Sequence, residues 1–153
     1  MRKLGWCFWA IAFGCIFGCH SSPSMMLEMV GQGYEWYIHY PVDSDSGGEV
    51  VVKRDIYVPA NTELKIHLTS RDYIYALKIP EFEQNQMAVP DIAFDLSFNT
   101  GAPGIYTLKG DQMCGYTHDT LKGQLVVLAK ADYERWITSQ AQQASVRPGN
   151  GAH

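Results

Sequence analysis

The sequence predicts an all-β fold, a Greek-key sandwich or small barrel with one short helix near its C-terminal end. Leu64, Ile66 and Leu68 alternate with polar residues, as expected of strands with one buried face. The same period recurs between residues 92 and 98, and the turn-forming stretches DSDSGG, VPAN and GAPG separate the apolar runs. Six or seven strands at this spacing, in a folded part of about 110 residues, are typical of such sandwiches.

Each expected element follows from its local pattern. The apolar and β-branched runs predict strands, in chain order, at residues 27–40, 50–58, 63–69, 73–79, 92–98, 104–109 and 123–128. Only KADYERWIT, residues 130–138, has a helical pattern, with Asp132 near its start.

The 153 residues are enough for one domain with a sizeable core. We expect a signal peptide at residues 1–19, a tether at 20–24, the folded domain at 25–138 and a disordered tail at 139–153. Beyond the first three residues there is no basic run, and the formal net charge is −4, so nucleic-acid binding is not expected.

The N-terminal segment has the organisation of an export signal. Arg2 and Lys3 precede an apolar stretch, residues 5–19, that is shorter than the roughly 18 to 20 residues of a membrane-spanning helix. The sequence around Cys19 resembles the bacterial lipoprotein signal, which implies cleavage after Gly18 and a lipid on Cys19. A short uncleaved anchor is the alternative. Either interpretation places the domain outside the cell membrane, on its periplasmic face, and tethers it there.

Cysteine usage then singles out Cys114. Cys7 and Cys15 would leave with the signal and Cys19 would carry the lipid, so one thiol remains in the folded part. A free thiol in an oxidising compartment is a liability unless it is buried, ligating or reactive. Cys114 lies four residues before His118, in a glycine-bounded loop.

Several stretches together resemble a known family. They are GYEWYIHYP (33–41), DIYVPANTELKIHLTSRDYIYALKIP (55–80), QMAVP (86–90), GIYTLKGDQMCGYTH (104–118) and a closing helix that carries Trp136. In this order they resemble the periplasmic copper domain of cytochrome c oxidase subunit II. The resemblance implies a cupredoxin fold.

The resemblance also implies where copper ligands would stand. The family's dinuclear CuA centre uses two cysteines, two histidines, a methionine and a glutamate backbone carbonyl. Cys114 and His118 match the second cysteine and second histidine. The other positions have changed: Tyr75 stands at the first histidine, Gly110 at the first cysteine, Gln112 at the glutamate and Leu121 at the methionine. One cysteine cannot supply two bridging thiolates, so a dinuclear centre is not expected.

Half of the centre remains as a candidate mononuclear copper site. Thiolate and imidazole bind copper well in either oxidation state, and Cys114, His118 and the Gln112 carbonyl all belong to the same copper in the family. Tyr75 is the candidate fourth ligand. The alternative is a metal-free remnant, as in quinol oxidases, whose subunit II keeps this fold without copper. Trp36 stands in the strand through which family members accept electrons, and a packed core residue is its alternative role.

These observations lead to one functional hypothesis with two alternatives. The leading one is a membrane-anchored cupredoxin of respiratory electron transfer, with at most one copper, whose partners are an oxidase catalytic subunit or a c-type cytochrome. The alternatives are a copper-free interaction or assembly module of an oxidase and a periplasmic Cu(I)-handling protein. No nucleophile, base and acid can be assembled into a stand-alone enzyme.

Overall fold

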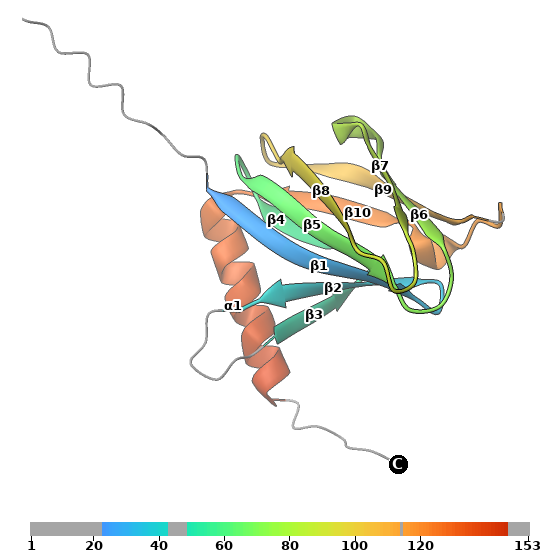
Figure 1. Cartoon of the computed structure of the whole chain (residues 1–153). Coiled ribbons are helices and arrows are strands. Elements are labelled where there is room, and N and C mark those ends of the chain that lie inside the picture. The colour runs from blue at the N-terminus through green and yellow to red at the C-terminus, as the bar shows by residue number, and fades with distance from the viewer. Residues whose placement is uncertain (1–22, 43–48, 114, 147–153) are drawn as a thin grey trace, which may run out of the picture.

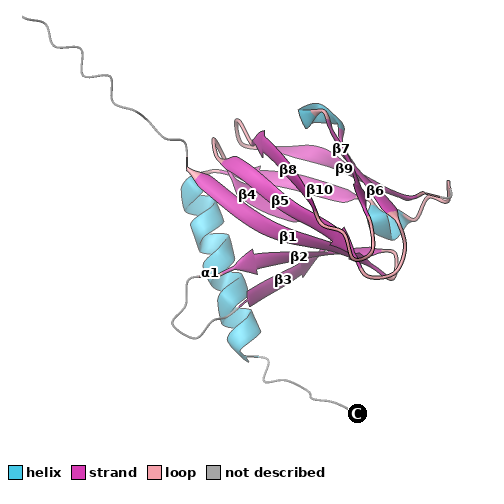
Figure 2. Ribbon diagram, viewed as in Figure 1, coloured by secondary structure: helices cyan, strands magenta, loops and turns pink. Residues whose placement is uncertain are grey.

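The computed structural model describes residues 23–42, 49–113 and 115–146 (Figure 1). These residues form ten strands, two short 3₁₀ helices and one α-helix (Figure 2). In chain order the elements are β1 (Ser24–Gln32), β2 (Glu35–Pro41), β3 (Glu49–Lys53), β4 (Ile56–Pro59), β5 (Glu63–Ser70), β6 (Tyr75–Ile79), η1 (Pro80–Phe82), β7 (Gln84–Ala88), β8 (Phe94–Asn99), β9 (Gly104–Gln112), η2 (Asp119–Leu121), β10 (Gly123–Leu128) and α1 (Lys130–Val146).

The strands form a sandwich of two five-stranded sheets, so the predicted all-β class is confirmed. One sheet has the order β3-β2-β1-β5-β8 and the other the order β4-β10-β9-β6-β7. The pairs β1–β5 and β10–β4 are parallel, and the remaining pairs are antiparallel. The parallel pairs require connections that cross between strands distant in sequence, as in Greek-key folds.

The core lies between the inner faces of the sheets. Leu64, Ile66 and Leu68 on β5 are all at most 1% exposed, as their alternation predicted. On β8 the pattern is confirmed for Leu96, which is 4% exposed. Ile92 is instead 50% exposed, because it precedes β8 and lies in the turn region that follows β7.

Two of the expected strands are each divided in two. Residues 27–40 form β1 and β2, joined by a two-residue turn in which Gly33 (φ 59°) and Tyr34 (φ 62°) are both left-handed. Such a turn matches the twist of the strands that it joins. Residues 50–58 form β3 and β4, divided at Arg54 (φ 76°), and the two strands belong to different sheets.

The C-terminal helix is longer than expected. It continues to Val146, so residues 139–146, which the sequence assigned to the tail, are helical. This segment is rich in Ala and Gln and has neither Gly nor Pro before Pro148, so nothing in it ends a helix. Trp136 anchors α1 to the sandwich: its ring stacks on Tyr57 (centroids 4.6 Å apart) and meets the edge of Tyr40 (5.1 Å).

The predicted signal peptide and Cys19 lie outside the described residues, as do residues 147–153. Ser24, which the sequence assigned to the tether, is the first residue of β1. Within the described part of the chain, no helix is long and apolar enough to cross a membrane.

Candidate metal centre

The sheet register brings several predicted ligand positions together at one end of the sandwich. β6 pairs with β9 so that Tyr75 lies opposite Gln112 and Leu77 opposite Gly110. After β9 the chain turns through a loop to His118, which immediately precedes η2, and η2 ends at Leu121. Cys114 lies outside the described residues.

Position 110 has no room for a side chain. A Cβ atom built on Gly110 would lie 2.5 Å from the Leu121 carbonyl oxygen and 2.6 Å from Nε1 of Trp36. The indole nitrogen donates a hydrogen bond of 3.0 Å to that same carbonyl, and Trp36 and Leu121 are both fully buried. The place of the family's first cysteine is therefore closed by a hydrogen-bonded tryptophan.

Tyr75 is also part of the core. Its side chain is fully buried, and its hydroxyl donates to Oδ1 of Asp72 (2.7 Å) and accepts from the Tyr34 amide (3.2 Å). Burial, and then the neighbouring Asp72 carboxylate, raise the pKa of Tyr75 well above the usual range of a phenol. The Tyr75 hydroxyl is thus held as a hydrogen-bond donor to Asp72, and ionisation of this phenol is disfavoured.

Asp72 connects the β1–β2 turn to the segment that precedes β6. Its carboxylate accepts hydrogen bonds from the Tyr75 hydroxyl and from the amides of Gly33 (2.6 Å) and Tyr73 (2.8 Å). Burial alone would raise the pKa of Asp72, but these donors outweigh it and lower that pKa below its ordinary value. Asp72 lies only three residues before Tyr75, but the sequence pattern did not predict this role.

His118 is half-buried and stacks on Tyr34. Their ring centroids are 4.0 Å apart and their planes differ by 23°. Tyr34 also stacks on Tyr73 (5.2 Å), so the candidate ligand His118 belongs to an aromatic group beside the loop that follows β9. Tyr34 lies in the turn between β1 and β2, and this position brings its ring against His118.

The Gln112 carbonyl already has one partner. It accepts a hydrogen bond of 3.0 Å from the Gly115 amide, which leaves one lone pair of the oxygen for another partner. Met113 and Met87 are 61% and 37% exposed, so neither is a core residue.

Trp36 occupies the position that suggested electron entry. Its side chain is fully buried and contacts the Tyr75 ring edge-on at 5.6 Å. A partner docked on the surface would not touch the indole directly. This geometry corresponds to the alternative role, a packed core residue.

Two other histidines lie on the outer face of the first sheet. Nδ1 of His39 lies 3.0 Å from Glu49, and Nδ1 of His67 lies 2.7 Å from Asp95. The partner of His39 lies on the neighbouring strand, because β2 pairs with β3. Within the residues that the structure describes, no three His, Cys, Asp or Glu side chains are grouped so as to hold a metal ion.

Comparison with known proteins identifies the family. The model of the periplasmic domain of cytochrome C oxidase subunit II matches residues 42–128. The chain belongs to this family. Cytochrome c oxidase subunit 2 of Thermostichus vulcanus is 27% identical over 115 residues, which are 75% of this chain and 33% of that protein. Heme-copper oxidase subunit 2 of Aeropyrum pernix is 29% identical over 113 residues, 72% of this chain and 47% of that protein.

Solved structures of subunit II have the same fold. The periplasmic domain of subunit II (CoxB) of Bradyrhizobium japonicum superposes with a TM-score of 0.69 at 18% identity, over 78% of this chain and 95% of that chain. This likeness confirms the cupredoxin-like sandwich that the sequence resemblance implied. The chain spans a third to about half the length of the two curated relatives described above.

Copper binding is general in the subunit II family, so the fit of these residues to a dinuclear centre can be tested. Gly110 offers no ligand and no space for one, the Tyr75 hydroxyl donates to Asp72, and Leu121 is buried. The residues of this half do not fit a copper ion. The other half depends on His118, Gln112 and Cys114, of which the first two are described.

Proposed function

We propose that this chain is an exported, membrane-anchored component of subunit II type that serves respiratory electron transfer with at most one copper. The signal would comprise residues 1–19, with Cys19 lipidated, and the tether would end at residue 23. The domain would extend from Ser24, the first residue of β1, through the helix to residue 146. The proposal is carried by a single observation: a subunit II fold in which one half of the metal centre is filled by protein.

Copper, if bound, would be held by Cys114, His118 and the Gln112 carbonyl, and would supply one-electron redox chemistry. His118 is supported in this role by its place at the mouth of the loop, half-buried against Tyr34. The buried network behind it offers no fourth ligand, because the Tyr75 hydroxyl is engaged by Asp72. Removal of Tyr75 from the ligand set leaves a three-donor site, which is weaker than a closed one.

The proposed partners are an oxidase catalytic subunit and a c-type cytochrome. The two relatives described above are oxidase subunits, and one matching solved structure, with a TM-score of 0.52 and 23% identity, is a heme-copper terminal oxidase dimer. The acidic chain, with a net charge of −4, suits a basic cytochrome.

Oxygen consumption by membranes tests this function. Membranes from cells that lack the chain should consume oxygen more slowly with a reduced c-type cytochrome as donor, and restoring the full chain should restore the rate. Quinol-driven oxygen consumption by the same membranes is the control and should not change. Equal cytochrome-driven rates with and without the chain would contradict the proposal.

A second candidate function is a copper-free module that docks onto an oxidase or helps to assemble it. The observation in its favour is the closed half-site, in which the Trp36–Leu121 hydrogen bond gives the fold a core that does not depend on metal. If the chain is such a module, cells that lack it should contain less oxidase in the membrane, measured by haem absorbance. The rate of cytochrome-driven oxygen consumption should fall in parallel.

A further inference from the structure

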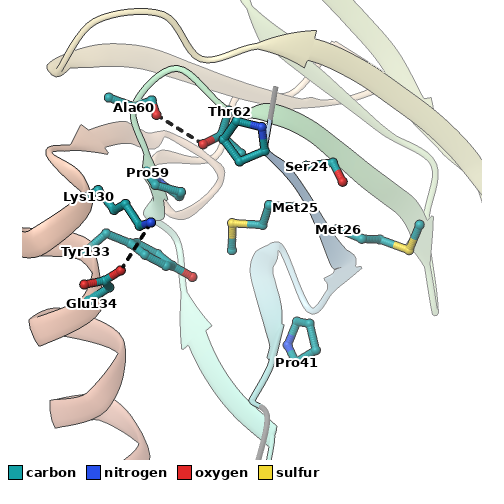
Figure 3. Close-up of a pocket in the computed structure, with 11 residues that line it drawn as sticks. Ser24, Met25, Met26, Pro41, Pro59, Ala60, Thr62, Lys130, Tyr133 and Glu134 are labelled. Atoms are coloured by element: carbon teal, nitrogen blue, oxygen red, sulfur yellow. Dashed lines mark hydrogen bonds and ion pairs between the residues drawn. The ribbon is translucent and has the colours of Figure 1, made fainter. Parts of the chain in front are cut away.

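A pocket lies beside the starts of β1 and α1. Figure 1 shows these starts at the end of the sandwich opposite the orange segment around residue 120, between β9 and β10. The volume of the pocket is about 410 Å³, within the range of pockets that hold small ligands. The starts of β1 and α1 and the ends of β2 and β4 form its walls, and most of the lining is apolar: Met25, Met26, Pro41, Pro59, Ala60 and Tyr133. In Figure 3 the side chains of Met25 and Tyr133 extend toward each other across the pocket.

The pocket is suited to an aliphatic chain rather than to a charged group. Burial raises the pKa of the Tyr133 phenol to about 12, in keeping with an environment poor in water. The charged residues of the lining are Lys130 and Glu134, whose side chains lie 4.0 Å apart. Their opposite charges offset each other, so the rim offers no net charge to a headgroup.

The path of the chain indicates the source of such a ligand. Pro23 lines the pocket, and the apolar segment of residues 5–19 ends four residues before it. Four residues span at most about 14 Å, so an anchor at Cys19 would hold the pocket within that distance of the bilayer. Exposed Met26 (62%) stands beside the same opening.

We propose that this pocket receives an acyl chain of a bilayer lipid and so fixes the orientation of the domain on the membrane. This inference rests on the proposed membrane anchoring, but not on copper. The lipid would be bound through its hydrocarbon chain, so binding would not depend on an anionic headgroup. With the pocket on the bilayer, the loop with Cys114 and His118 would face away from it.

Photo-crosslinking of the full chain tests the proposal. The chain is reconstituted into phosphatidylcholine vesicles, with and without phosphatidylglycerol, that contain a lipid with a diazirine in its acyl chain. After illumination, labelled peptides are mapped by mass spectrometry. Labels should concentrate on Met25, Met26, Ala60 and Tyr133, equally in both vesicle types, and should be absent from exposed Ile105 on β9.

A matched pair of variants sharpens this test. Met26 and Ile105 are both exposed apolar strand residues, but only Met26 lines the pocket. Met26→Glu places a carboxylate at the opening and should reduce pocket labelling at least about fivefold, whereas Ile105→Glu should leave it unchanged. A pocket-filling variant, Ala60→Phe, should also reduce labelling, and an unchanged melting temperature shows that a variant is folded.

Flotation of the vesicles separates the two proposals. A chain that floats but is labelled evenly, or not at the pocket, overturns the pocket proposal and leaves the anchoring intact. A chain that does not float overturns both.

Discussion

At the scale of single residues, the feature that decides the chemistry is the contact of Trp36, Gly110 and Leu121. The indole donates to the Leu121 carbonyl and occupies the space beside Gly110. A ligand position has thus become a close-packed contact in which only glycine fits. The buried Tyr75 beside it extends the same core toward Asp72.

Gly110→Ala should lower the free energy of unfolding by about 1–3 kcal/mol, because the new methyl group would overlap the Leu121 carbonyl and the indole. Chemical denaturation of the full chain in detergent measures this change. Gly104→Ala on the same strand is the control: its nearest neighbour is the movable ring of Tyr106, at 3.1 Å, and the cost should stay below about 1 kcal/mol. An equal loss in the free energy of unfolding for the two variants would contradict the conclusion that position 110 has no room for a side chain.

Tyr75→Phe should destabilise the fold by about 1–2 kcal/mol, because the hydroxyl that donates to Asp72 is lost. The same variant should leave copper affinity and any visible spectrum unchanged, since the phenol is engaged within the protein. Denaturation and copper titration of one preparation give both values. A shifted visible spectrum together with unchanged stability would contradict this account and indicate that Tyr75 is a copper ligand.

At the scale of elements, Asp72 ties the β1–β2 turn to the start of β6. It accepts from the Gly33 amide in the turn and from the Tyr75 hydroxyl on β6. Because these donors lower the pKa of Asp72, its contribution to stability is present above the pKa of the unfolded chain. That contribution is lost as the pH falls through the folded-state pKa.

Asp72→Asn should therefore flatten the acid limb of the stability curve. For the unaltered chain, the free energy of unfolding should fall as the pH drops below about 4, the usual range for aspartate. The variant should show a shallower fall between about pH 4 and pH 2. Glu35, Glu81 and Asp119 also have lowered pKa values and leave a residual slope. Parallel curves would contradict the role of Asp72.

Strand periodicity predicted which segments form strands better than it predicted where those strands begin and end. The alternation on β5 marked the buried face correctly, because each strand residue alternates between core and solvent. The β1–β2 turn was not predicted, because Tyr34 has a left-handed conformation there that tyrosine rarely adopts. The predicted end of helix α1, at residue 138, came too early. The last two turns of the helix are polar and have no apolar stripe, although nothing in them ends a helix.

At the scale of the whole molecule, the chain is a subunit II domain with two unlike ends. One end carries the loop with His118, backed by a closed aromatic core, and the other carries the apolar pocket beside Pro23. The resemblance predicted the family and the convergence of the ligand positions. It could not show that Trp36 fills the first cysteine position, because that contact joins residues 74 positions apart and depends on packing.

Copper stoichiometry of the full chain in detergent tests the central claim most directly. The chain is titrated with Cu(II) and separately with Cu(I), desalted, and then followed by metal analysis and visible absorption. The account predicts at most about one copper per chain, and Cys114→Ser should abolish its retention and any thiolate band. A colourless Cu(I) complex would favour copper handling, and no retained copper would favour the copper-free module. About two coppers per chain would contradict the account, because the half-site behind Gly110 would then have to be open.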